Sequence, residues 1–206
     1  KKRKIKVNLI KKTDFESNKV LNLLKKSQPS LIVLAGFLMK MPVNITEKFE
    51  KKIINIHPAL LPKYGGKGMY GIHIHKKVIE NKENESGLTI HYVNEEYDKG
   101  QIIFQKKVKV NLKDSPELLA KKILIQEHFY YSKIIEEILK NNKLAISLIL
   151  FTLLFSIIIY FKPRFLFTKD GAIRQFGLGK VNSSIIPIWV IVFILAIFCY
   201  LFICCS

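Results

Sequence analysis

The residues best suited to chemistry in this 206-residue chain lie in and just after one short apolar run, Ile53 to His57. The run is predicted to be a buried strand that ends near Pro58, because proline has no N–H for a ladder. Asn55 and His57 are two residues apart, so both side chains point to one face of that strand. An amide N–H can stabilise developing negative charge, and an imidazole can give or take protons near neutral pH.

The strand is followed by a loop that contains Pro62, Gly65, Gly66, Gly68 and Gly71. Such a loop has little reason to pack and is free to shape itself around a ligand. The carboxyl ends of strands are also where open parallel α/β sheets bind ligands. A histidine that simply caps a buried strand fits the same residues, so both interpretations stay open on this stretch alone.

The sequence before this stretch predicts alternating strands and helices. Strands are expected at 3–10 and, covered on both faces, at 31–36. A helix is expected from Asp14 to Ser27, and a second, capped by Thr46, through Lys52. The alternation favours a doubly wound parallel sheet, in which right-handed crossovers bring the loops after 36 and 57 to the same edge.

The sequence after the loop predicts a helix over 71–81 and two strands, 86–93 and 101–110. The connection between these strands is short, so they are expected to be antiparallel, with Asp98 in the turn between them. A long helix is expected from Asp114 to about residue 139, because a cap candidate is followed by proline and glutamate.

The residues after the strand also resemble a known family. Asn55-Ile-His-Pro-Ala-Leu-Leu-Pro-Lys-Tyr64 and the following Gly-Gly-Lys-Gly-Met-Tyr-Gly-Ile-His73 look like phosphoribosylglycinamide formyltransferase, a folate-dependent family of purine synthesis. The resemblance covers Ile5 to about Leu139. It implies a Rossmann-like formyltransferase domain over 1–140, with a mostly parallel sheet and an antiparallel edge. It also implies formyl transfer from 10-formyltetrahydrofolate to the amine of glycinamide ribonucleotide.

The resemblance implies roles for individual residues as well. Asn55, His57 and Asp98 match the family's catalytic trio. Glu127 matches a glutamate that contacts the glycinamide substrate. Leu38, Met39, Lys40 and Met41 correspond to the loop that holds the pterin of the folate through backbone contacts, and Asn55 is also implied to bind the folate cofactor.

Without the resemblance, the same residues have plainer interpretations. Asp98 fits a turn-forming carboxylate, residues 38–41 fit an apolar exit loop, and Glu127 fits a solvated helix charge. His91, on a neighbouring strand, either shapes the site or is a structural histidine. His73 and His75 are spaced i, i+2 on a helix and do not converge, so no metal site is expected.

Formyl transfer passes through a tetrahedral carbon whose oxygen becomes negative while the attacking amine loses a proton. Asn55 would donate an N–H to that oxygen, and His57 would move the proton. Asp98 would hold the imidazole in one orientation and favour its charged form.

Two other functions stay open. A methionyl-tRNA formyltransferase-like enzyme shares the trio and the Leu-Leu-Pro segment, although it usually has a different loop and a later oligonucleotide-binding barrel. The second alternative is a non-catalytic, membrane-tethered remnant that still binds folate. The family's first strand and phosphate-binding glycine loop are expected upstream of Lys1, so this chain alone is expected to be weakly active or inactive.

Composition divides the chain into two unlike parts. Only five of its 34 Lys and Arg residues and one of its 16 Asp and Glu residues lie beyond Lys143. The lysines of the first part are scattered, so no nucleic-acid partner is expected. All three cysteines lie in the last eight residues, and no secretory signal follows Lys1. The first part is therefore expected in a reducing compartment, the cytoplasm.

The last third, residues 144–205, is predicted to be a membrane hairpin unrelated to the enzyme family. Residues 144–161 and 185–205 contain no charge, and both are long enough to cross a hydrocarbon core. The connection between them holds five cations and one acid, which favours the cytoplasmic side for that loop. This orientation conflicts with a cytoplasmic enzyme domain. A second interpretation therefore stays open, in which the segment comes from a separate membrane protein and was joined to the enzyme by fusion.

Overall fold

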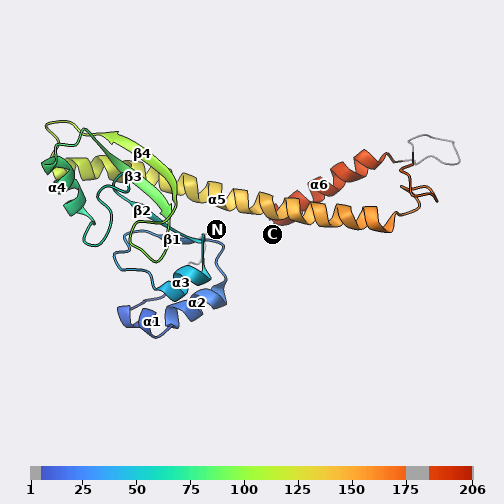
Figure 1. Cartoon of the computed structure of the whole chain (residues 1–206), viewed down its shortest axis with the longest axis horizontal. Coiled ribbons are helices and arrows are strands. Elements are labelled where there is room, and N and C mark those ends of the chain that lie inside the picture. Colours follow the sequence, from blue (N-terminus) through green and yellow to red (C-terminus); the bar gives the residue numbers. More distant parts are fainter. Residues whose placement is uncertain (1–5, 175–185, 206) are drawn as a thin grey trace. The chain divides into compact units, whose positions relative to one another are not determined.

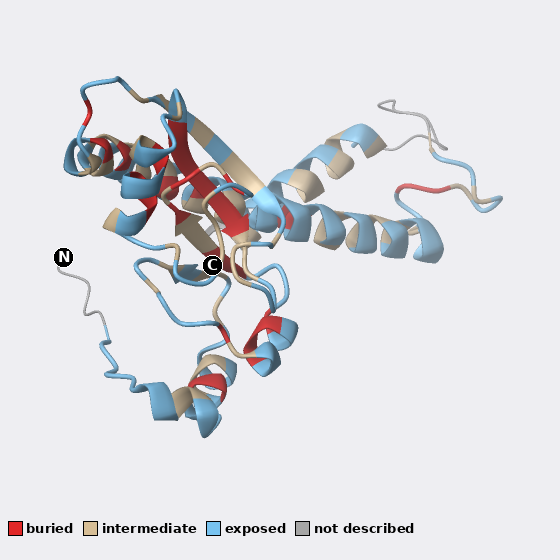
Figure 2. Ribbon diagram, turned by 60° about the vertical axis from the view of Figure 1, so that its left-hand side comes forward, coloured by how far each residue is buried: buried red, intermediate tan, exposed pale blue. Residues whose placement is uncertain are grey.

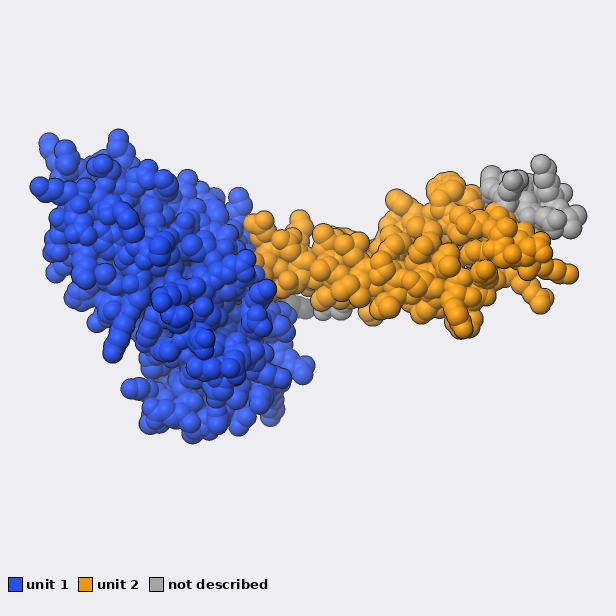
Figure 3. Space-filling view, in the orientation of Figure 1, with its two compact units in different colours: residues 1–135 blue, residues 136–206 orange. Residues whose placement is uncertain are grey.

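The computed structural model describes residues 6–174 and 186–205 and divides the chain into two compact units, residues 1–135 and 136–206 (Figure 3). The first unit contains a four-stranded sheet in the order β1-β2-β3-β4 (Figure 1). The strands are β1 (Ile32–Leu34), β2 (Ile53–His57), β3 (Glu85–Tyr92) and β4 (Ile102–Lys109). The predicted strand ending at Pro58 and the two later strands are therefore confirmed.

The sheet is mixed, and the prediction of a mostly parallel sheet is wrong for the described residues. β1 and β2 are parallel, β2 and β3 are antiparallel, and β3 and β4 form the antiparallel pair expected from their short connection. His57, the last residue of β2, pairs with Thr89 in the middle of β3, so the first residues of β3 extend past the carboxyl end of β2. The chain between them thus stays at the carboxyl end of β2 and does not cross back over the sheet, so β3 must run in the opposite direction.

The N-terminal part differs most from the sequence-based expectation. Residues 6–10 form no strand, and the side chains of Val7 and Leu9 are 86% and 88% exposed. Residues 3–5 of the expected strand lie outside the described residues. β1 is three residues long and Val33 is 40% exposed, so β1 is an edge strand here and is not covered on both faces. Alternation predicts a strand only where a neighbouring strand accepts its hydrogen bonds.

The helices of this part begin and end at other residues than expected. The single helix predicted from Asp14 is two, α1 (Lys12–Glu16) and α2 (Lys19–Ser27), because Asn18 between them is left-handed with φ of 58°. The next helix, α3 (Val43–Lys48), begins after Pro42. Thr46 therefore does not cap it; its hydroxyl donates to the Val43 carbonyl within the helix.

Helix α4 (Ile72–Glu80) confirms the prediction for 71–81, with Ile74 and Val78 fully buried. Helix α5 (Pro116–Phe161) begins as expected but continues through residue 139 to Phe161. The segment 139–143 contains neither proline nor glycine, so nothing in it stops the helix. Figure 2 shows the buried residues of the first unit concentrated on the strands and on the sides of helices that face them.

The start of α5 is fixed to the sheet by one tyrosine. The Tyr131 hydroxyl lies 2.7 Å from the Leu34 carbonyl and 3.2 Å from the Ile54 carbonyl, on the two parallel strands. Leu119 and Ile123, on earlier turns, are 0% and 1% exposed. This contact supports the strand ends that carry the site described below.

The second unit holds the rest of α5 and helix α6 (Ile188–Cys205). By length and composition, α5 is long and apolar enough to cross a membrane, whereas α6 is a shorter apolar helix in the described part of the chain. Phe155 and Ile159 of α5 and Trp189 and Val192 of α6 line one apolar cavity, so the two helices lie side by side within this unit.

Candidate active site

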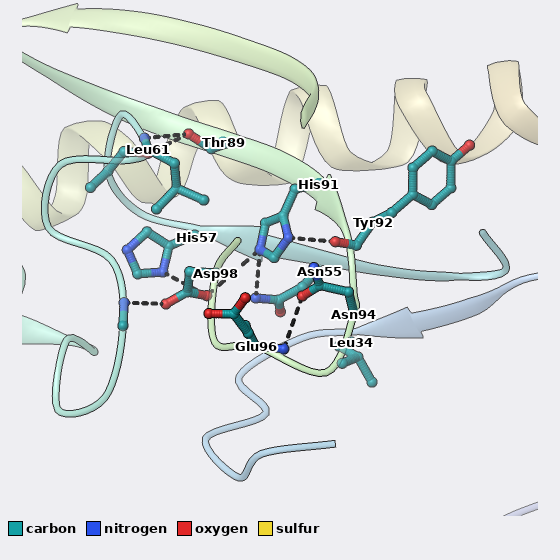
Figure 4. A network of polar contacts seen from close by, with 12 residues as sticks. Leu34, Asn55, His57, Leu61, Thr89, His91, Tyr92, Asn94, Glu96 and Asp98 are labelled. Atoms are coloured by element: carbon teal, nitrogen blue, oxygen red, sulfur yellow. Dashed lines mark hydrogen bonds and ion pairs between the residues drawn. The ribbon is translucent and has the colours of Figure 1, made fainter. Parts of the chain in front are cut away.

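The site is built on cross-strand pairs at the centre of the sheet. Asn55 of β2 pairs with His91 of β3, and His57 pairs with Thr89. Because side chains alternate along a strand, the two residues of each strand point to the same face. Figure 4 shows Asn55, His57 and His91 grouped around Asp98, which comes from the turn after β3.

His57 lies between a carboxylate and a carbonyl. Its Nδ1 is 3.6 Å from Asp98 Oδ1, and its Nε2 is 2.7 Å from the Tyr64 carbonyl. A carbonyl only accepts hydrogen bonds, so Nε2 carries the proton in the neutral ring and Nδ1 is the nitrogen that titrates. The side chain is 5% exposed, and this burial lowers the pKa of His57, although Asp98 and the Tyr64 carbonyl act in the opposite direction.

Asp98 is held in a fixed position by the loop after β2. Its backbone is left-handed, with φ of 54°, and its Oδ2 accepts the Gly66 N–H at 2.8 Å. Burial by itself would raise the pKa of this carboxyl. His91, the Gly66 N–H and His57 together outweigh burial and lower the pKa of Asp98, so the group is a carboxylate at neutral pH.

His91 is a member of the site that the sequence left undecided. Its Nδ1 lies 2.8 Å from the Tyr92 carbonyl, which fixes the proton on Nδ1 in the neutral ring. Its Nε2 lies 3.4 Å from Asn55 Nδ2 and 3.6 Å from Asp98 Oδ1. The neutral ring therefore accepts one N–H of Asn55 and leaves the second N–H of that amide for a ligand. The signal in the sequence that could have placed His91 at the site is its i, i+2 spacing from Thr89, which puts both side chains on one face of the strand.

The first half of the loop after β2 is packed and anchored, contrary to expectation. Thr89 Oγ1 donates to the Ala59 carbonyl at 2.6 Å and accepts the Leu61 N–H at 3.0 Å. Gln105 Nε2 donates to the Leu61 carbonyl at 2.9 Å. Gly65 is required where the loop approaches the turn, because a Cβ there would lie 2.6 Å from Leu61 Cδ2 and 3.2 Å from Asp98 Cβ.

A cavity of about 340 Å³ opens beside these side chains. Asn55, His91 and Asp98 line it, whereas His57 does not. Further lining residues come from the second half of the loop, residues 66–70, and from the segment after β1. All four residues predicted to hold a pterin, Leu38, Met39, Lys40 and Met41, line this cavity.

A family model described as formyl transferase matches residues 1–135. The chain belongs to the formyl transferase family. The match ends at the residue where the first compact unit ends, so the family domain and that unit coincide.

Several relatives in this formyl transferase family are named phosphoribosylglycinamide formyltransferase. The chain is 46% identical over 125 residues to the chloroplastic phosphoribosylglycinamide formyltransferase of Arabidopsis thaliana, covering 61% of this chain and 43% of the relative. It is 42% identical over 106 residues to the phosphoribosylglycinamide formyltransferase of Haemophilus influenzae, covering 52% and 48%. The chain thus spans about half the length of the curated relatives it matches.

Solved structures agree on the fold. The phosphoribosylglycinamide formyltransferase of Bacillus halodurans has a TM-score of 0.51 at 36% identity, covering 56% of this chain and 57% of that one. The Streptococcus pneumoniae enzyme has a TM-score of 0.55 at 29% identity, covering 62% and 68%. The mixed sheet with flanking helices is therefore the Rossmann-like sheet of the formyl transferase family.

One residue predicted for the site stands apart from the others. Glu127, on α5, is half-buried, and burial raises the pKa of its carboxyl. It does not line the cavity beside Asn55. Its contact with substrate stays a prediction. In the described part of this formyl transferase chain, no group of three His, Cys, Asp or Glu residues is placed to hold a metal ion.

Proposed function

We propose that the first unit transfers a formyl group from 10-formyltetrahydrofolate to the amine of glycinamide ribonucleotide. One observation carries the proposal: Asn55 and Asp98, the latter next to His57, line the same cavity as the Leu38–Met41 segment. The names of the relatives support this acceptor over a methionyl-tRNA, and make the reaction a step of purine biosynthesis.

The residues account for the two requirements of the reaction. The amine nitrogen bonds to the formyl carbon, the bond from that carbon to the folate nitrogen breaks, and a proton passes from the amine to the folate nitrogen. The free N–H of Asn55 donates to the formyl oxygen as that oxygen becomes negative. His57 is neutral, so its Nδ1 can accept a proton. His57 does not line the cavity, so the proton reaches it by way of Asp98, whose carboxylate lies 3.6 Å away and stabilises the resulting charge.

The remaining substrate contacts follow from the cavity and the family likeness. The backbone of residues 38–41 holds the pterin, and Glu127 contacts the glycinamide part of the acceptor. The chain spans about half the length of its relatives, so groups for the ribose phosphate are proposed to come from a part of the enzyme outside this chain. The formyl donor is a co-substrate, and no metal is required by this scheme.

A formyl-transfer assay tests the proposal. It uses the gene product that contains all 206 residues and any residues encoded before Lys1, with 10-formyltetrahydrofolate and glycinamide ribonucleotide. Asn55→Ala is expected to lower kcat by about 10²-fold or more. The matched control is Asn22→Ala, on the exposed side of α2. Equal rates for wild type and Asn55→Ala would refute the enzyme and favour a non-catalytic folate-binding remnant.

For the second unit, we propose a two-span membrane hairpin that tethers a cytoplasmic enzyme domain. Its spans are residues 144–161 of α5 and the segment 185–205, which contains α6. The uncharged composition of both and the length of α5 support this proposal. Extraction of membranes with alkaline carbonate tests it. The full chain is expected to stay in the pellet, and its release into the supernatant would refute insertion.

A further inference from the structure

The segment that follows α5, residues 162–174, is a folded turn, named here the connector turn. The Thr168 N–H donates to the Ala172 carbonyl at 2.8 Å and closes the turn. Leu166 and Phe167 are 1% and 4% exposed, so the turn has a small core of its own. The connector turn therefore presents its polar groups from a fixed backbone.

The outward side of the connector turn is cationic. Lys162, Arg164 and Lys169 are exposed, and in the described ranges 6–174 and 186–205 no carboxylate forms an ion pair with any of them. The only acid between 144 and 205 is Asp170. A fourth cation, Arg174, is half-buried and donates through Nε to the Phe167 carbonyl at 3.0 Å. The connector turn thus carries positive charge that the described carboxylates do not neutralise.

Exposed aromatic side chains lie at the helix ends that flank the connector turn. Tyr160 and Phe161 end α5 and are 81% and 74% exposed, and Phe165 is 63% exposed. Trp189, in the first turn of α6, is 68% exposed. Tyrosine and tryptophan concentrate where the apolar core of a bilayer meets its headgroups, because each has an apolar ring and one polar group.

The order of side chains along the chain matches the layers of a membrane leaflet. Residues 144–161 contain no charge for 18 positions, their last residues are exposed aromatics, and cations follow at once. At about 1.5 Å per residue the uncharged part is about 27 Å long, close to the thickness of a hydrocarbon core. The cations are thereby placed at the depth of the phosphate groups.

We propose that the connector turn binds the anionic headgroups of lipids, through Lys162, Arg164 and Lys169. The inference rests on the proposed membrane insertion and adds the class of lipid that the hairpin recognises. Each lysine or arginine near an anionic surface strengthens binding about fivefold at moderate salt. Arginine also matches a phosphate with two parallel N–H groups. The hairpin would gather anionic lipids around the connector turn.

Trp189 makes the proposal measurable, because it is the single tryptophan of the chain. The full chain is reconstituted into phosphatidylcholine vesicles in which a minor fraction of lipid has brominated acyl chains, which quench a tryptophan that they touch. The brominated lipid is either phosphatidylglycerol or phosphatidylcholine, at equal fraction. We expect brominated phosphatidylglycerol to associate with Trp189 at least about fivefold more strongly, and added salt to reduce the difference.

The decisive variant is Lys162→Gln/Arg164→Gln/Lys169→Gln, which should abolish the preference. Its matched control is Lys25→Gln/Lys26→Gln/Lys48→Gln, which removes three exposed cations of the first unit and should keep the preference. Equal quenching of the wild type by both brominated lipids would overturn the proposal while leaving membrane insertion intact. If neither lipid quenched Trp189, the hairpin itself would be refuted. A preference that persists in the triple variant would also overturn the proposal.

Discussion

The carboxylate of Asp98 lies 3.6 Å from Nδ1 of His57, the only nitrogen of that ring free to take up a proton. The distance is too long for a hydrogen bond but short enough for strong electrostatic attraction once the ring is charged. Burial favours the neutral ring and the carboxylate favours the charged one. Burial outweighs the carboxylate, so the pKa of His57 is lowered and the ring is neutral at rest, while Asp98 reduces the cost of charging it.

Replacing Asp98 with asparagine should move the pH dependence of the reaction as well as slow it. The carboxylate raises the pKa of His57 against burial, so its removal lowers that pKa further. The acid limb of kcat/KM, where His57 becomes protonated, should therefore shift to lower pH, with a rate loss of about 10²-fold or more. The pH–rate profile of the D98N variant checks this. Asp170→Asn, at an exposed position of the second unit, is the control. An unmoved acid limb would contradict the assignment of His57 as the titrating group.

Replacing His91 should disturb Asn55, and it also removes one of the groups that lower the pKa of Asp98. His91→Leu removes the acceptor that holds the Asn55 amide, so kcat should fall about tenfold or more while KM for the folate changes less. His91→Gln restores an acceptor and should recover part of the loss. Steady-state kinetics of both variants measure the effect. Equal losses in the two variants, with unchanged thermal midpoints, would argue against a role in orienting the amide.

Replacing Thr89 with valine should destabilise the loop that carries Tyr64 and Gly66. The fully buried hydroxyl bonds to Ala59 and Leu61, and its loss leaves buried polar groups of the loop without a partner. The expected cost is about 1–3 kcal/mol, whereas Thr89→Ser should keep most of the stability. Thermal unfolding of the full chain in mild detergent compares the two. A valine variant as stable as wild type would show that the loop is held mainly by its other contacts.

The first unit should lose stability in acid. Burial lowers the pKa of His57 and of His75, and Nδ1 of His75 has no hydrogen-bond partner within the described residues. A histidine whose folded pKa is lowered contributes stability above its ordinary value of 6.5, and that contribution is lost as the pH falls through the lowered folded value.

The midpoint temperature of unfolding should therefore decrease as the pH is lowered from neutral through the ordinary histidine value of 6.5 and below it. His75→Leu should flatten this dependence by removing one of the buried titrating groups. His73→Gln, at an exposed position of the same helix, should leave it unchanged. The opposite sign, greater stability in acid, would mean that His57 is held charged in the folded protein.

The sequence by itself determined most of the local elements and supplied the candidates for the reactive groups. The Asn55/His57 strand ends just before Pro58, which has no N–H for a ladder. The helix α4 and the strands β3 and β4 follow from the periodicity of apolar residues within each segment. The family motif also pointed to residues 38–41, which line the cavity. These features depend on residues close together in sequence.

Tertiary structure alone decided how the elements are joined and which groups meet. The direction of β3 and the exposed segment 6–10 depend on which strand is available as a neighbour, and alternation says nothing about that. His91 was ambiguous for the same reason. It joins the site only because the register places it opposite Asn55, 36 residues away, and the turn returns Asp98 to the same ring nitrogen.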